Sequence, residues 1–188
     1  MTAKTIKQTY LLLDADVVIE AHALGIWEAL IERCKVLLPS IVVHDEALFF
    51  HRDINGIPQD IDLPQLVQDG KVMEVAALIE DIVVFCALFD RVFIETLHGG
   101  EIEALALLKA GKAPGSFFCT GDSHAIEALA MAGMSERGIS FEIALRSVGL
   151  NRRLREQFRE SYFKRHLRTG RINRITGQGL ELRRLTDS

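Results

Sequence analysis

Residues 10–20, YLLLDADVVIE, constrain the fold more than any other stretch of the chain. Four apolar or aromatic residues lead into Asp14, and Asp16 follows two positions later. An apolar run bounded in this way is typical of a strand buried in a parallel sheet. Open α/β sheets bind their ligands at the carboxyl ends of such strands. We therefore expect Asp14 to be either the first ligand of an acidic site or a turn residue, depending on how the other strands end.

The composition indicates a globular protein. The 188 residues are 48% hydrophobic and 26% charged, which suits one domain with an appendage and excludes disorder. The first ten residues contain no apolar signal core, and no window approaches 18 uninterrupted apolar residues, so we expect a soluble cytoplasmic protein without a membrane partner. Cys34, Cys86 and Cys119 have no zinc spacing and favour buried, reduced thiols.

Apolar periodicity and turn residues predict alternating strands and helices. Strands are expected before Asp14 and at 35–38, 71–75 and 117–120, with helices at 21–33, 41–50, 100–111 and 123–133. Ser40 is expected to cap the second helix, and residues 52–75 to form a polar, hairpin-like insertion that returns to the sheet. The apolar residues 76–97 are expected to form one or two buried helices that stop at Gly99-Gly100. Residues 140–148 are expected to form a strand or a short helix. The alternation predicts an α/β fold whose mainly parallel sheet has helices on both faces.

The charge divides the chain into a predicted domain, residues 1–149, and a basic extension, residues 150–188. The first part holds 11 Lys and Arg against 22 Asp and Glu, and the second holds 11 against 4. Such an extension binds a polyanion, docks on the acidic body, or docks on a second subunit. Its apolar residues recur every four positions beside basic ones, at Leu150, Leu154, Phe158 and Tyr162. We expect this stripe to dock, Gly170 to end the helix, and residues 171–185 to form a loose hairpin.

Acidic residues occur at element ends in four places: Asp14, Glu46, Glu101 (or Glu103) and Asp122. Each has an ordinary structural explanation, because Asp is common in strand-to-helix turns and Glu in first helical turns. Two buried strands that both end in Asp at one sheet edge, however, bring like charges together, which is unfavourable unless a cation neutralises them. Carboxylate oxygens with no Cys or His nearby suit Mg²⁺ or Mn²⁺.

Four segments together resemble the PIN-domain ribonucleases. They are LLLDADVVI (residues 11–19), LPSIVVHDEA (38–47), GEIEALALL (100–108) and FFCTGDSHA (117–125), in the order and with the spacing of that family. The resemblance covers roughly residues 10–135. It implies a three-layer α/β/α sandwich, with the residues after 149 as an addition, whose carboxylates hold one or two divalent metal ions and hydrolyse RNA phosphodiester bonds.

The resemblance also assigns roles to individual residues. The implied catalytic and metal-binding set is Asp14, Glu46, Glu101 and Asp122. Glu103 is the alternate for Glu101, because two residues apart on a helix do not face the same ion. Asp16 falls where the family steadies the first Asp. Thr120 and Ser123 either contact a ligand or cap the following helix, and capping is the simpler expectation.

RNA brings negative charge to an acidic site, so the cation is needed for binding as well as for activating water. Arg152, Arg153, Arg155 and Arg159 of the extension are the candidate phosphate contacts. The expected partners are single-stranded or structured RNA, an antitoxin-like protein and a second copy of the chain in a homodimer.

Two other functions compete with the nuclease. Residues 14–18, DADVV, also resemble the Asp-x-Asp motif of haloacid-dehalogenase-like phosphatases, and residues 120–133 resemble their later acidic motif. That family would leave Glu46 and Glu101 unexplained, and its usual lysine has no clear counterpart. The third possibility is a non-catalytic PIN-like module that binds RNA or a protein.

Overall fold

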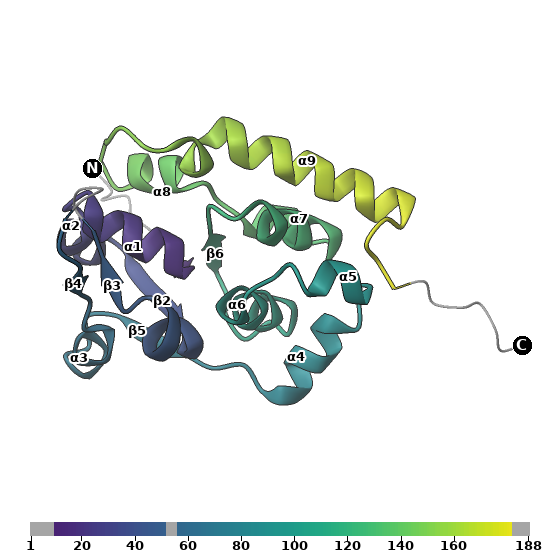
Figure 1. The fold of residues 1–188 in the computed structure, drawn as a ribbon, viewed down its shortest axis with the longest axis horizontal. Coiled ribbons are helices and arrows are strands. Elements are labelled where there is room, and N and C mark those ends of the chain that lie inside the picture. The colour runs from purple at the N-terminus through teal and green to yellow at the C-terminus, as the bar shows by residue number, and fades with distance from the viewer. Residues whose placement is uncertain (1–9, 52–55, 182–188) are drawn as a thin grey trace, which may run out of the picture.

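The computed structural model describes residues 10–51 and 56–181 and has an α/β fold (Figure 1). Its main sheet contains four parallel strands in the order β5-β2-β1-β6. The strands are β1 (Tyr10–Leu13), β2 (Lys35–Pro39), β5 (Met73–Val75) and β6 (Ser116–Cys119). The predicted α/β class and parallel sheet are therefore confirmed.

Strand β1 lies between β2 and β6. In the register of the sheet, Leu11 pairs with Val36 on one side and with Phe117 on the other. The chain leaves β1 toward β2 and β5, and later returns to form β6 on the opposite side of β1. The strand order thus reverses beside β1. The carboxyl ends of β1 and β6 flank the crevice in which open α/β sheets bind ligands.

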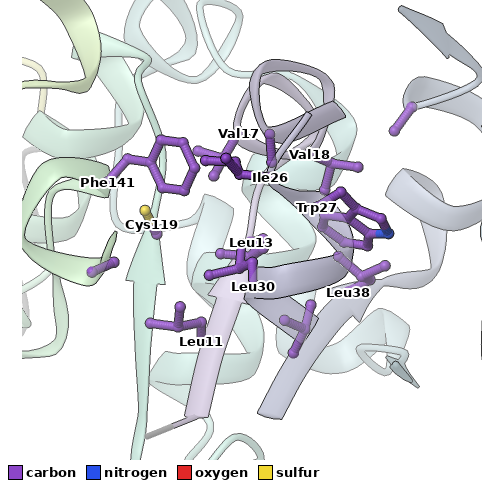
Figure 2. Packing of buried hydrophobic residues seen from close by; sticks show 14 of the residues in the cluster. Leu11, Leu13, Val17, Val18, Ile26, Trp27, Leu30, Leu38, Cys119 and Phe141 are labelled. Atoms are coloured by element: carbon purple, nitrogen blue, oxygen red, sulfur yellow. The ribbon is translucent and has the colours of Figure 1, made fainter. Parts of the chain in front are cut away.

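Helices cover both faces of the sheet, because alternate strand residues point to opposite sides. One face carries α1 (Ala15–Ala23), α2 (Trp27–Arg33) and α8 (Phe141–Ser147). These helices pack on Leu11, Leu13 and Cys119, as Figure 2 shows. The other face carries α6 (Gly99–Lys109) and α7 (Ser123–Met131), around Leu12 and Phe118, and α4 (Ile79–Cys86) packs on α6 from outside. This arrangement is compatible with a three-layer α/β/α sandwich.

The first helix begins at Ala15, six residues earlier than the expected start at residue 21. Asp14 caps it, because its Oδ1 accepts a hydrogen bond of 2.7 Å from the Ala15 amide. The expected single helix over 21–33 is broken at Gly25, whose φ of 64° is accessible to glycine without steric strain. The Asp14 cap therefore starts a helix at Ala15 even though Val17 and Val18 are β-branched and favour strands, and Gly25 allows the turn that separates this helix from the next.

The segment after β2 is helical as expected but shorter than the predicted 41–50: residues 40 and 41 begin a helix that continues as one π-helical turn, η1 (Val42–Glu46). The turn stops early because β3 (Phe49–Phe50) pairs with β4 (Gln59–Asp60) in an antiparallel hairpin. Ser40 does not cap the turn but donates a hydrogen bond to Glu74 of β5. Helix α3 (Leu63–Gln68) follows, and β5 then joins the main sheet, which confirms the predicted return of the insertion to the sheet.

Residues 76–97 form α4 and α5 (Arg91–Ile94), but they are not the buried helices that their apolar sequence predicts. Phe85 is the only fully buried residue of α4. Gly99 and Gly100, expected to stop a helix, instead open α6. Residues 140–148 are helical, since the Ser140 side chain caps α8 through the Ile143 amide.

The C-terminal segment packs on the body of the protein. Leu150, Leu154 and Phe158 pack into the hydrophobic core that contains Leu11, Leu13 and Cys119, so the predicted docking of this stripe is confirmed for these residues. Most of the stretch is not helical. The short 3₁₀ turn η3 (Glu156–Phe158) leads into α9 (Glu160–Thr176), which lies along α7 (Figure 1).

The end of α9 differs from the expectation. Gly170 lies inside the helix, at a point where a side chain would collide with the backbone of Glu127 on α7. The helix ends at Gly177, which has a left-handed conformation. The hairpin expected over 171–185 is therefore wrong for residues 171–176, and residues 182–185 lie outside the described part.

The described residues bear on the expected absence of a membrane span and on the state of the three cysteines. None of their helices is both long and apolar enough to cross a membrane. Cys34, Cys86 and Cys119 are free thiols, and Cys34 and Cys119 are buried as predicted, whereas Cys86 is only partly buried.

Candidate active site

A cavity of about 530 Å³ lies at the carboxyl ends of β1 and β6. Five acidic side chains line it: Asp14, Asp16, Glu46, Glu101 and Asp122. They come from the ends of two strands, the first turn of α1, the turn η1 and the first turn of α6. The four residues that the sequence nominated as metal ligands thus converge on one cavity, at the point where the strand order reverses.

Asp14 and Asp122 are linked by one threonine. The Thr120 hydroxyl donates a hydrogen bond of 2.7 Å to Asp14 Oδ2 and accepts one of 3.0 Å from the Asp122 amide. Asp122 in turn caps α7, with its Oδ1 accepting hydrogen bonds from the amides of residues 124 and 125. Thr120 therefore positions the two aspartates and is not the helix cap expected from the sequence. Ser123 is simply the first residue of α7 and does not line the cavity.

Glu46 is held in place by the start of α6. Its Oε1 accepts a hydrogen bond of 3.0 Å from the Gly100 amide. Any side chain at residue 100 would collide with the Glu46 carboxylate and with Val42. Gly100 is thus required by the close approach of α6 to the Glu46 side chain, a reason that no local sequence pattern reveals.

Glu101 and Glu103 face different surroundings. Glu101 lines the cavity, and its Oε2 accepts a hydrogen bond of 2.9 Å from the His98 amide. Glu103 points elsewhere, because its two oxygens accept hydrogen bonds from the amides of Ile41 (3.0 Å) and Ala77 (3.1 Å). Glu103 therefore fastens α6 to the segments that follow β2 and β5, and Glu101 is the acid placed for chemistry.

Asp16 has one satisfied and one unsatisfied oxygen. Its Oδ2 accepts a hydrogen bond of 2.9 Å from the Gly121 amide. Its Oδ1 is buried, and no group of the described residues hydrogen-bonds to it. A buried carboxylate oxygen without a partner is unfavourable by about 1–3 kcal/mol or more, so it calls for a proton or a cation.

Burial and the charges of neighbouring carboxylates raise the pKa of three of these acids. Burial raises the pKa of Asp14 to about 6, aided by the charges of Glu46 and Asp122 and opposed by its hydrogen bonds. Burial followed by the charge of Asp14 raises the pKa of Glu101 to about 9. The same two causes hold the pKa of Asp16 well above its usual range. The protein thus keeps several acids together at an electrostatic cost that a divalent cation would offset.

The donor set suits a hard cation such as Mg²⁺ or Mn²⁺, since every acidic ligand offers carboxylate oxygens. Within residues 10–51 and 56–181, however, no three His, Cys, Asp or Glu side chains are close enough to make a ready-formed metal site. The carboxylates nevertheless line one shared cavity. The orphaned Asp16 Oδ1 is the observation that fits a cation best.

The nominated arginines lie outside the cavity. Arg152 and Arg153 are exposed. Arg155 forms an ion pair of 2.5 Å with Glu20, and Arg159 donates a hydrogen bond of 3.0 Å to the Leu154 carbonyl. Arg155 therefore also holds the C-terminal segment to the body, and Arg159 stabilises that segment internally.

Three polar residues of the cavity wall were not nominated from the sequence: His98, Gln157 and Tyr162. His98 adjoins the glycine pair that was interpreted as a helix stop. Tyr162 was assigned to the apolar stripe, and no pattern singled out Gln157. Only the packing of the C-terminal segment places Gln157 and Tyr162 opposite the carboxylates.

Comparison with protein-family models, with curated proteins and with solved structures found no match. The function is therefore inferred from the cavity and from the sequence motifs that build it.

Proposed function

We propose that this protein is a metal-dependent endoribonuclease of the PIN type. The observation that supports it is the cavity: five acidic side chains from separate segments meet beside β1 and β6, and Asp16 Oδ1 is buried without a partner. Helix capping accounts for Asp14, Glu101 and Asp122, one for each helix, but not for the presence of Asp16 and Glu46 in the same cavity.

Asp14, Glu46, Glu101 and Asp122 would hold Mg²⁺ or Mn²⁺. A bound ion supplies a water of lowered pKa and neutralises charge that develops on the phosphate. The chain itself orients the acids: Thr120 fixes Asp14, and the Gly100 amide fixes Glu46. The sheet and the first turns of α1, α6 and α7 make this arrangement rigid, which favours a fixed position for the scissile phosphate.

RNA binding needs positive charge beyond the cavity, since the cavity wall is acidic. Arg152 and Arg153 are exposed, and Arg152 has only an exposed hydrogen bond to the adjacent Asn151 carbonyl, so both can reach phosphates; Arg155 and Arg159 have structural contacts as well. Double replacement of Arg152 and Arg153 by Gln should weaken RNA binding and reduce its salt dependence. Unchanged affinity and salt slope would remove the extension from the RNA-binding surface.

The decisive test is metal-dependent cleavage of single-stranded RNA by the wild type and by Asp14→Asn. Asparagine removes the charge and keeps one of the two oxygens that accept hydrogen bonds from Ala15 and Thr120, so cleavage should fall at least about a hundredfold while the free energy of unfolding falls by only about 1–3 kcal/mol. Asp69→Asn, at the exposed end of α3, is the matched control and should cleave normally. Cleavage that persists in Asp14→Asn, or in chelator, contradicts the proposal.

One observation keeps the phosphatase alternative open, since Asp14 and Asp16 line the same cavity. Two others disfavour it. Glu46 and Glu101 line the cavity as well, and no lysine does among the described residues. Release of inorganic phosphate from small phosphate esters, without cleavage of RNA, would establish the phosphatase instead.

A further inference from the structure

Part of the cavity wall comes from the C-terminal segment. Gln157 of η3 and Tyr162 of α9 line it, together with Ile19 of α1. Tyr162 differs from the other residues of its stripe, because Leu154 and Phe158 are buried and Tyr162 is only half-buried. The neighbouring Phe163 is the residue of this turn that packs into the interior. Tyr162 is therefore not needed to fill the core and presents part of its surface to the cavity.

The Tyr162 ring is held by an anchored neighbour. The His166 ring lies against it, with ring centroids 4.4 Å apart and planes inclined by 46°. His166 Nδ1 forms a hydrogen bond of 2.7 Å with Glu127 on α7, and both side chains are largely buried. Helix α7 is the helix that Asp122 caps. His166, which lies on α9 like Tyr162, thus ties the helix that carries the ring to the helix that Asp122 caps.

A cation accompanies the ring. The Arg165 guanidinium lies over the Tyr162 ring, 5.1 Å from its centroid, so it must turn aside before a base can stack on that face. It is 3.3 Å from Glu156 in an ion pair that is largely exposed, so it can turn toward a ligand. The cavity wall therefore combines carboxylates for a metal-bound phosphate with an aromatic ring, and the charge of Arg165 lies beside that ring, outside the residues that line the cavity. A nucleotide has the matching groups, namely a flat base and anionic phosphates.

From this geometry we propose that Tyr162 is a stacking platform for one unpaired nucleobase next to the scissile phosphate, with Arg165 contacting the adjoining phosphate. The proposal rests on the proposed nuclease function for the position of the phosphate. Aromatic rings bind bases of single strands by stacking, whereas paired bases in a duplex have their faces covered. Tyr162 is a positioning residue in this role, and it makes the C-terminal segment part of the substrate site.

The first experiment measures binding without cleavage. A fluorescein-labelled single-stranded RNA octamer is titrated in Ca²⁺ by fluorescence anisotropy against wild type, Tyr162→Leu and Tyr162→Phe. Loss of the ring should weaken binding about tenfold, and phenylalanine should restore most of it. Tyr10→Leu is the matched control, because Tyr10 is a partly exposed tyrosine at the opposite, amino end of β1. Thermal unfolding of all variants checks that the fold is intact.

The second experiment locates the base. Octamers with a single abasic site at each position in turn are titrated against wild type and Tyr162→Leu. In the wild type one position should lose about tenfold in affinity, and that loss should disappear in Tyr162→Leu, because the partner ring is gone. A structural role for Tyr162 would weaken all octamers alike, which overturns the proposal.

The outcomes separate the subsite from the nuclease. Equal binding by Tyr162→Leu and wild type, with cleavage intact, rejects the subsite and leaves the nuclease. The position-specific loss without any cleavage by the wild type establishes the subsite and rejects the nuclease. A wild type that binds no octamer rejects the subsite.

Discussion

Helices α4 and α6 both have strongly apolar sequences, yet they have opposite environments. In α6 most residues are buried, including Glu101 and Glu103. In α4 only Phe85 is buried, and Ile79, Val83 and Val84 are 77%, 60% and 62% exposed. The helix that carries the candidate acids is enclosed, and the helix with the larger apolar side chains faces outward.

The difference follows from their positions. Helix α6 lies on the sheet, in contact with β2, and its other neighbours are α4 and α7. Helix α4 packs on α6 and forms an outer layer (Figure 1). A helix in the outer layer contacts the rest of the protein along one side only, so it buries one narrow stripe of side chains whatever its amino-acid composition. Apolar sequence therefore predicts what a helix can bury, and the position of the helix in the fold decides what it does bury.

The largest expected difference concerns the two glutamates of α6. Glu101→Gln should lower RNA cleavage at least about a hundredfold and leave the fold intact, since Glu101 lines the cavity. Glu103→Gln should retain cleavage but lower the free energy of unfolding by about 1–3 kcal/mol, because an amide NH₂ cannot accept both backbone hydrogen bonds. Cleavage kinetics and urea unfolding of both variants measure this. Loss of cleavage in Glu103→Gln at unchanged stability would reverse the assignment.

Truncation of one side chain on each helix tests the contrast in burial. Leu105→Ala in α6 should lower the free energy of unfolding by about 2–5 kcal/mol, because Leu105 is fully buried. Val83→Ala in α4 should change it by less than about 0.5 kcal/mol, because Val83 is mostly exposed. Denaturant unfolding at low protein concentration, where association is negligible, compares the two. Equal losses would show that α4 is enclosed in solution.

The acids of α6 should also give the metal-free protein an unusual pH dependence. The pKa values of Glu101 and Asp14 are raised on folding, so the folded state binds more protons than the unfolded chain. Their favourable contribution is complete below about pH 4 and is lost as the pH rises through about 6 for Asp14 and about 9 for Glu101. In chelator, Tm should therefore be several degrees higher at pH 5 than at pH 8.

The matched variants identify the source of that dependence. Glu101→Gln should flatten the curve of Tm against pH, and Glu80→Gln, on the exposed surface of α4, should leave it unchanged. Added Mn²⁺ should raise Tm more at pH 8 than at pH 5, because the metal binds deprotonated carboxylates. A Tm that rises with pH in chelator would contradict the raised pKa values.

The smallest effect on folding is expected for Val83→Glu. It should leave Tm of the protomer nearly unchanged but abolish the homodimer that the sequence predicts, if α4 forms its interface. Sedimentation velocity over a range of concentrations measures this. Ile57→Glu is the control, since Ile57 is 86% exposed on the β3–β4 hairpin, away from α4. A Val83→Glu protein that associates like the wild type would exclude this face.

Local sequence determined the parts of the structure that depend on neighbouring residues. The apolar runs before Asp14 and before residue 121 form β1 and β6, and a turn aspartate caps the helix after each. That pattern, with Glu46 and one of two glutamates near residue 101, was enough to nominate the acids that line the cavity. It was enough because strand ends and first helical turns are set within a few residues.

Only the tertiary structure decided which surfaces meet. It separated Glu101 from Glu103, made Thr120 a bridge between two aspartates, and required glycine at residue 100 beside Glu46. It also exposed α4 and brought Tyr162 from the distant C-terminal segment to the cavity. These outcomes depend on contacts between residues far apart in the chain, and a local pattern carries no information about its distant partner.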